Sequence, residues 1–428
     1  MSRLRVQESA QVSVLGFISL NIRSTTLMIS ALLAVSLWSG CRSDAPSARS
    51  QDTRSDVAAE PLKRAALVGA RDPAKKLEIF RFFKYLMGTK FTIQLLGYDQ
   101  LTAQAAARAA FNEVARVEHL VSSWRADSEI GVLNRAAGIE SVSLSLESAW
   151  LLCQSRSISR LTRGAFDVTW AALKGLWDFR NARMPEHKLL QKRLRSVGMK
   201  HLTLELTSEV DQAEQPLDAC RSLYTSRLPP FWSRFTSDPP ALWSQKWKGY
   251  LKLKTARVDL GGIAKGFGVD QAARVLRRLG YQDFLIDGGG DLLASGRTLG
   301  GDPWSVGIAH PRAKATWGRL WIPSGWSVVT SGDYERYFIR DQVRYHHIID
   351  LRTGYPGRGS VSVTVIARSA MLADAYATGL FILGPREGLA LAESLPDLEA
   401  IFFTPTGEVI STEGARVFSH DLKTRWRQ

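Results

Sequence analysis

The chain has 428 residues, of which 45% are hydrophobic and 23% are charged, and its formal net charge is +15 at pH 7. This is the composition of a soluble globular protein, long enough for one large domain or two smaller ones. The positive balance favours anionic partners. The basic residues are scattered, without an arginine-rich arm, zinc-finger spacing or an aromatic RNA-binding motif, so we expect no nucleic-acid partner.

The first segment along the chain predicts export. An apolar run, LMISALLAVSLWSGC, follows several arginines and is too short to span a bilayer comfortably, which is typical of a signal peptide over residues 1–41. Its end resembles the lipobox of bacterial lipoproteins, in which the cysteine becomes the lipidated first residue, although Trp38 stands where leucine is usual. We expect a protein anchored through Cys41 at the periplasmic face of the bacterial inner membrane, with an exported soluble protein as the alternative.

Residues 42–76 are polar with small side chains and predict a disordered tether. The folded domain is expected over 77–420, interrupted by an irregular insertion at 207–248 that is rich in proline and tryptophan. In an oxidising compartment Cys153 and Cys220 could pair as a disulfide, which the sequence does not decide.

Hydrophobic periodicity predicts strands and helices throughout the expected domain. Many consecutive strands flanked by helices indicate an α+β fold, with a mixed, largely antiparallel sheet at its core, in a single catalytic domain. The expected strands are 85–97, 283–287, 291–296, 304–309, 317–322, 326–331, 334–339, 343–349, 360–367, 399–403 and 408–411, and the expected helices are 99–121, 146–162, 186–198, 263–279, 369–383 and 385–394.

The motif DLGGIAKGFGVD, residues 259–270, places an acid and a lysine among four glycines at the start of a helix. It fits neither a P-loop, because Gly266 follows the lysine, nor a dinucleotide fingerprint, because Gln271 stands at the last glycine position. Glycines let the backbone approach a ligand, and a helix N-terminus favours an anion. Lys265 would then add a positive charge. Tight strand–helix packing with an exposed lysine is the alternative.

The apolar helix SAMLADAYATGLFILG, residues 369–384, contains a single carboxylate, Asp374. A buried charge is costly unless it is paired or bound to a cation. Thr378 lies four residues on and therefore on the same helix face. Carboxylate and hydroxyl oxygens are hard ligands that suit Mg²⁺. The alternative is a carboxylate that pairs with a buried lysine or caps a neighbouring helix.

Two further stretches carry polar residues at strand ends. In RYHHIIDLRTGYPG, residues 344–357, strand alternation places His347 on the same face as Ile349 and makes it a candidate site residue, against the alternative of a core histidine. In LIDGGGDLLASG, residues 285–296, the glycines predict a sharp turn, and we expect Asp287 and Asp291 to be structural.

These motifs occur in one order, together with MGT, GAFDVT and TSGDYERYF. The set resembles the FAD:protein FMN transferases, the ApbE-like flavin transferases, over about residues 80–410. Any one motif is weak, whereas the ordered set is specific. Many members of this family are periplasmic lipoproteins, which agrees with the N-terminal segment.

The resemblance implies a site assembled from the whole chain. It implies Mg²⁺ held by the carbonyl of Gly262 with Asp374 and Thr378, and it makes His347 a candidate general base beside the catalytic Asp374. The residues that it implies around FAD are Met87, Trp124, Ala165, Phe166, Asp167, Asp259, Lys265 and Ile349.

The implied reaction transfers the FMN moiety of FAD to a threonine hydroxyl of an acceptor protein and releases AMP. The acceptors of such enzymes are typically flavin subunits of membrane redox complexes. Three alternatives stay open: hydrolysis of FAD to FMN and AMP at the same site, a non-catalytic flavin-binding lipoprotein, and a protein that binds membrane or nucleic acid through its charge.

Overall fold

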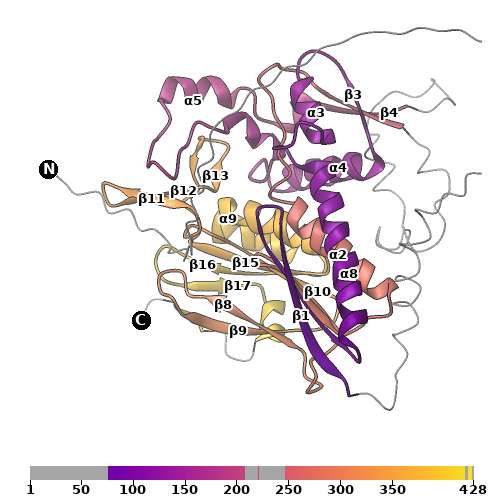
Figure 1. Ribbon diagram of the computed structural model, residues 1–428. Helices are drawn as coiled ribbons and strands as arrows, with labels where there is room; N and C mark the ends of the chain where they lie inside the picture. The colour runs from indigo at the N-terminus through magenta and orange to yellow at the C-terminus, as the bar shows by residue number, and fades with distance from the viewer. Residues whose placement is uncertain (1–75, 208–219, 221–245, 420–422, 427–428) are drawn as a thin grey trace, which may run out of the picture. The chain divides into compact units, whose positions relative to one another are not determined.

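The computed structural model describes residues 76–207, 220, 246–419 and 423–426. Within these ranges the centre of the fold is one antiparallel sheet of eight strands (Figure 1). Its strands, in spatial order, are β1 (Glu78–Leu86), β2 (Thr89–Gly97), β6 (Phe284–Gly288), β7 (Asp291–Ser295), β10 (Trp326–Gly332), β15 (Ser362–Ala367), β16 (Leu398–Phe403) and β17 (Val409–Ser411).

Three helices pack on one face of the sheet. They are α2 (Gln100–Val121), α8 (Ala264–Arg278) and α9 (Ala370–Glu393), and apolar residues from alternate strand positions meet them, among them Ile93 and Ile286. Their strand neighbours Leu96 and Leu285 belong to a core on the opposite face. That core is closed by the hairpin β8 (Trp304–Ala309) and β9 (Thr316–Ile322) and by the short helix η3 (Gly414–Phe418).

A second layer of short elements follows α2 along the chain and lies above the large sheet in Figure 1. It contains α3 (Glu129–Arg135), α4 (Leu146–Leu161), α5 (His187–Leu194), the short helices η1 (Val168–Leu173) and η2 (Met199–His201), and the three-stranded sheet of β3 (Val142–Leu144), β5 (Lys246–Leu251) and β4 (Leu202–Thr207). Two small hairpins complete the fold: β11 (Tyr337–Arg340) with β12 (Val343–His346), and β13 (Ile349–Asp350) with β14 (Tyr355–Pro356).

The α+β class and the antiparallel sheet flanked by helices are confirmed, and every pairing within the eight-stranded sheet is antiparallel. The expected segments 1–41 and 42–76 lie outside the described residues, except for Lys76. Most of the expected insertion lies outside them too. The two ends of this insertion lie on neighbouring strands, because β4 pairs with β5 from Thr207 opposite Lys246 to Leu202 opposite Leu251.

Three local predictions were wrong. The single strand expected at 85–97 is a hairpin, because the chain reverses at Met87 and Gly88, which have φ of 50° and 74°. Helix α3 occupies a stretch expected to be a loop, with Ser128 as its N-cap. The strand expected at 343–349 ends at His346. The two C-terminal helices expected at 369–383 and 385–394 are present, separated by a kink at Gly384, which has φ of 75° and lies within the element α9.

Cys153 on α4 and Cys220 form a disulfide in the structure, with their Cα atoms 5.4 Å apart. Both cysteines are buried. The bond ties Cys220, whose neighbours in the sequence lie outside the described residues, to the core of the second layer. The pairing that the sequence left open is therefore present in the structure.

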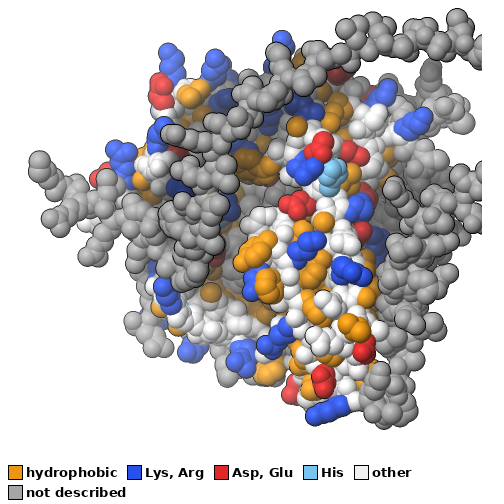
Figure 2. Space-filling view, viewed as in Figure 1, with side chains coloured by type: hydrophobic (Ala, Val, Ile, Leu, Met, Phe, Trp, Pro, Cys, Tyr) orange, Lys and Arg blue, Asp and Glu red, His pale blue; other side chains and the backbone are white. Residues whose placement is uncertain are grey.

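No helix among the described residues is both long enough and apolar enough to cross a membrane. On the face drawn in Figure 2, basic side chains lie scattered among hydrophobic ones over the region of β1 and α2. Strand β1 carries two exposed aromatic side chains, Phe83 and Tyr85, which are 62% and 74% exposed.

Candidate functional site

The glycine motif of residues 259–270 forms the turn into α8 and the first part of that helix. Gly266 allows α8 to cross α9 closely, because a Cβ there would lie 2.1 Å from the carbonyl oxygen of Ala370. Gly268 lies beside Met87, whose Sδ would be 3.2 Å from such a Cβ. Two of the four glycines therefore serve helix packing, which is the alternative reading of the motif for these positions.

The same crossing brings the lysine of the motif to the carboxylate of α9. The Nζ of Lys265 donates to Oδ1 and Oδ2 of Asp374 at 3.2 and 3.3 Å, and to Oδ2 of Asp291 at 3.0 Å. Asp374 also accepts the backbone N–H of Gly266 at 3.2 Å, which places it at the positive end of α8. Asp374 is thus paired with a lysine, as the alternative for this helix anticipated.

The charges of the two acids and the lysine in this cluster influence one another. Burial and the neighbouring Asp374 raise the pKa of Asp291 well above its ordinary value. Burial lowers the pKa of Lys265, but the two carboxylates raise it by more, so its net shift is upward and the ammonium stays charged. Two carboxylates share one ammonium. When both are ionised, the cluster carries a net negative charge that can receive another cation.

Hydroxyl groups and a glycine complete the cluster. Thr378 lies one turn beyond Asp374, and its Oγ1 is 3.5 Å from Oγ of Ser331 on β10. A Cβ on Gly262 would lie 3.8 Å from Thr378 Oγ1 and 3.4 Å from the ring of Phe166. The three residues proposed to hold a metal, Gly262, Asp374 and Thr378, are therefore brought together.

Oxygen donors of this kind fit a hard divalent cation better than a soft one. Pairing with Lys265 does not exclude this, because Asp291 remains as a second counterion for the lysine. Among the described residues, no three His, Cys, Asp or Glu side chains form a group able to hold a metal. A cation here would depend on hydroxyl and backbone oxygens beside the carboxylates.

Residues 165–167, which the resemblance implies as one wall of the FAD site, are buried beside this cluster. Ala165 and Phe166 belong to the same hydrophobic core as the inner face of α9. The carboxylate of Asp167 begins helix η1 and accepts hydrogen bonds from the backbone N–H and the hydroxyl of Thr169, at 2.8 and 2.6 Å, and from the N–H of Met199 at 3.2 Å. Burial raises its pKa. In the structure, the hydrogen bonds of Asp167 therefore stabilise the fold at the start of η1 and at Met199.

A second polar group surrounds Asp259, just before the glycines. Its Oδ1 accepts the N–H of Gly261 at 2.7 Å, and its Oδ2 accepts from Lys174 and Ser123. Trp124, which follows Ser123, is 85% exposed, and its ring lies over the Lys174 ammonium at 4.2 Å. Trp124 and Asp259, expected on one site, are thus linked through a residue that the sequence analysis did not select.

The two histidines lie at a bend. His346 ends β12 and is buried, with Nε2 bonded to the carbonyl of Gly357 at 2.8 Å and Nδ1 accepting from Ile348 N–H at 3.3 Å. Because the strand ends there, alternation does not place His347 and Ile349 on one face. Ile349 packs in a separate cluster with Trp177 and Phe338.

His347 keeps the features of a candidate base. Its Nδ1 is buried and has no hydrogen-bond partner among the described residues. Burial is the main cause that lowers its pKa to about 4, together with the neighbouring His346, Arg336 and Lys265, so the ring is neutral at pH 7. The influence of Lys265 places His347 in the electrostatic range of the carboxylate cluster.

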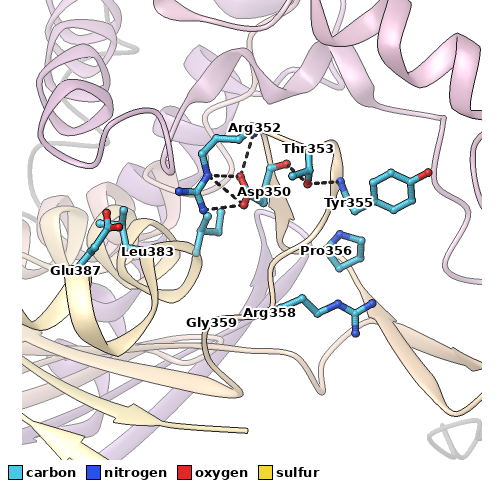
Figure 3. Close-up of a pocket in the computed structure, with 10 residues that line it drawn as sticks. Asp350, Arg352, Thr353, Tyr355, Pro356, Arg358, Gly359, Leu383 and Glu387 are labelled. Atoms are coloured by element: carbon cyan, nitrogen blue, oxygen red, sulfur yellow. Dashed lines mark hydrogen bonds and ion pairs between the residues drawn. The ribbon is translucent and has the colours of Figure 1, made fainter.

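A cavity of about 550 Å³ lies between the 350–359 loop and α9 (Figure 3). Arg352 turns onto Asp350 and donates to both of its carboxylate oxygens, whereas Arg358 extends away from them. Ile382 and Leu383 supply apolar lining one turn after Thr378. The sequence analysis did not select this cavity, because its walls meet only in the fold.

Comparison with known proteins identifies the family of this chain. The model of the ApbE family matches residues 87–402. A FAD:protein FMN transferase of Vibrio cholerae is 30% identical over 77% of this chain and 87% of its own length, and one of Treponema pallidum is 30% identical over 72% and 80%.

Solved structures of the same kind are similar. The ApbE protein of Thermotoga maritima has a TM-score of 0.64 at 26% identity, covering 80% of this chain and 100% of its own. The apo form of the Pseudomonas stutzeri flavinyl transferase gives a TM-score of 0.64 at 26% identity, covering 81% and 98%. The family model spans most of the described fold, from the β1–β2 turn to the end of β16, and this chain belongs to the ApbE family.

Proposed function

We propose that this protein transfers the FMN moiety of FAD to a threonine hydroxyl of an acceptor flavoprotein, releases AMP, and depends on Mg²⁺. The observation that carries the proposal is the cluster of Lys265, Asp374 and Thr378 at the crossing of α8 and α9. Its cation and its hard oxygen donors suit a pyrophosphate with a divalent metal. The curated relatives named as FAD:protein FMN transferases support the same chemistry.

In the proposed reaction, the threonine oxygen of the acceptor attacks the phosphorus on the FMN side of the pyrophosphate. The bond from that phosphorus to the bridging oxygen breaks, and AMP leaves with this oxygen. A bound Mg²⁺, held by Asp374, Thr378 and the Gly262 carbonyl, would neutralise charge on the pyrophosphate. Lys265 and the N-terminus of α8 add positive charge at the same place.

Two other residues of this chain have roles in the proposal. The neutral His347, whose Nδ1 meets no hydrogen-bond partner in the part of the chain that the structure describes, accepts the threonine proton. Trp124 offers an exposed indole on which an aromatic ring of FAD can stack. The acceptor that we propose is a flavin subunit of a membrane redox complex, because an anchored enzyme would share a membrane surface with it.

The test uses the full chain in detergent with FAD, Mg²⁺ and a candidate acceptor, which is then weighed by mass spectrometry. We expect a gain of one FMN that falls at least about 100-fold in Asp374→Ala. Asp397→Asn is the matched control, because that carboxylate is exposed and lies in a turn. AMP and FMN released without any acceptor gain would show a pyrophosphatase, and bound FAD without product would show a flavin-binding protein.

We also propose that the protein is exported and lipid-anchored through Cys41. The disulfide between Cys153 and Cys220 supports this, because such bonds persist in oxidising compartments outside the cytosol. Cys41→Ser should move the protein from the membrane fraction to the soluble periplasmic fraction. If both forms sediment equally with membranes, the anchor is not at Cys41.

A further inference from the structure

Trp124 stands on a short loop that is tied at both ends. Ser128 donates its hydroxyl to the carbonyl of Ser122 at 2.5 Å, closing residues 122–128 into a compact turn between α2 and α3. Gly131 lets α3 press against this turn, since a Cβ there would lie 1.9 Å from the carbonyl oxygen of Arg125. The exposed indole is therefore presented by a braced segment.

One face of this indole is occupied by a cation. The Nζ of Lys174 lies 4.2 Å from the centroid of Trp124 and 5.4 Å from that of Trp170. An ammonium over an indole ring is attracted to its electron-rich face. With 85% of Trp124 exposed, the opposite face of the ring is available to a planar ligand.

The ammonium of Lys174 is held by two oxygen atoms. It donates to Oδ2 of Asp259 and, at 2.9 Å, to Oγ of Ser123. An ammonium has three N–H donors, so within the described residues one remains. The carboxylate is occupied on both oxygens, because Gly261 N–H reaches Oδ1 and Ser123 reaches Oδ2.

Exposure decides which of the two charged groups faces a ligand. The Lys174 side chain is 24% exposed, and that of Asp259 is 8% exposed. The group available at this surface is therefore a hydrogen-bond donor with a positive charge, and the carboxylate lies behind it.

We propose that Lys174 is a ligand-binding residue that determines specificity in the FAD site, and that Asp259 is a positioning residue acting through it. This inference rests on the proposed function. Trp124 stacks on a planar heteroaromatic ring of the ligand, and the third N–H of Lys174 donates to an acceptor atom on the edge of that ring or on the attached chain. The ligand class is a flavin or purine ring, both of which carry such acceptors.

The experiment measures binding with the full chain in detergent by calorimetry, using FAD, FMN and ADP as probes. We expect Lys174→Met to weaken FAD binding about tenfold or more, because it removes a charged hydrogen bond and a cation–π contact. Lys174→Arg should recover most of the affinity, because guanidinium keeps both interactions. The KM for FAD should rise in Lys174→Met while kcat at saturating FAD changes less than about threefold.

The two smaller probes identify the ring. FMN carries the flavin without adenine, and ADP carries adenine without the flavin. Lys174→Met should weaken the binding of one of them and leave the other within about twofold of the wild type. The matched control is Lys90→Met, which removes an exposed lysine 4.5 Å from the ring of Phe83 and should change neither affinity.

Several results would overturn the proposal. They are unchanged FAD affinity in Lys174→Met, an equal loss for FMN and ADP, the same loss in Lys90→Met, or a wild-type chain that binds none of the three probes. The thermal midpoints of the variants show whether a loss of FAD affinity is caused by unfolding. If Lys174→Met is unfolded, the FAD affinity of Lys174→Arg tests the proposal in its place. If the wild type binds FAD but never modifies an acceptor, the proposed function fails. The binding affinities of the wild type and Lys174→Met then still test the role of Lys174.

Discussion

The carboxylate of Asp270 on α8 accepts the backbone N–H of Met371, in the first turn of α9, at 3.0 Å. It also accepts from the N–H of Ala370 at 3.0 Å and from the hydroxyl of Ser369 at 2.7 Å. One helix therefore caps the other. The cap fixes α9 relative to α8 one turn away from Asp374 and Lys265, so the last acid of the glycine motif serves the geometry of the carboxylate cluster.

The crossing at Gly266 should tolerate no side chain. We expect Gly266→Ala to lower the free energy of unfolding by about 3 kcal/mol, because its Cβ would meet backbone atoms of Ala370 that cannot rotate away. Urea denaturation measures this. Gly318→Ala is the control, because no atom of the residues that the structure describes lies within 4 Å of a Cβ at that position on β9. Equal effects of the two substitutions would contradict the close crossing.

Replacing Lys265 should lower the free energy of unfolding, because two buried carboxylates share its ammonium. Lys265→Met leaves Asp291 and Asp374 buried without their shared partner and should destabilise the fold by about 3 kcal/mol. Adding Asp291→Asn should return part of this loss, because one of the two repelling carboxylates is then neutral. A double-mutant cycle by urea denaturation tests the coupling. Strictly additive effects would show that the three groups do not interact.

His346 should make stability depend on pH. Burial lowers its pKa to about 4, below the 6.5 of the unfolded chain. The unfolded state then binds the proton more readily, so the stabilisation is present above pH 6.5 and is lost as the pH falls toward 4. Between pH 7.5 and pH 5 the loss is about 2 kcal/mol. Protonation would also place a second N–H against the N–H of Ile348.

The measurement compares the wild type with His346→Gln at both pH values by urea denaturation. The comparison is needed because Asp270 titrates in the same range with the opposite sign: burial raises its pKa to about 6, so its contribution is lost as the pH rises through that value. The stability advantage of the wild type over the variant should shrink at pH 5. A constant difference would mean that His346 does not titrate as a buried neutral ring.

The disulfide should contribute substantially to stability. It joins residues 67 apart in the sequence, and a loop of that length predicts about 4 kcal/mol from restriction of the unfolded chain. Reductant should therefore lower the unfolding midpoint of the wild type. It should leave the Cys153→Ser, Cys220→Ser double variant unchanged. If reductant lowers the midpoints of both proteins equally, its action lies elsewhere.

Local patterns predicted much of the fold because several elements carry their own signals. The helix at 263–279 and the strands at 304–309 and 317–322 were predicted to within one residue of the observed ends. The β1–β2 turn was missed because it uses Met87 at positive φ, where the usual signal is asparagine or aspartate before glycine. Helix α3 was missed because Gly131 lowers its helix propensity.

The residues of the candidate site were likewise predictable from the sequence only where they carry a local signal. Asp374, Thr378 and Lys265 could be selected because each stands out against apolar or glycine-rich neighbours. Asp291 was expected to be structural, and in the structure it forms an ion pair with Lys265. Lys174 carries no local signal, because its partner Asp259 lies 85 residues further along the chain. Such a pairing exists only once the second layer has folded against the turn before α8.

The bond between Cys153 and Cys220 has one more consequence. It closes a covalent ring of chain that contains the wall at 165–167 and Lys174. A protease that cut a single peptide bond inside this ring would leave both products joined, so they would migrate as one species until thiol was added. The wall and the lysine thus remain attached to the molecule after a nick that would divide an unlinked chain in two.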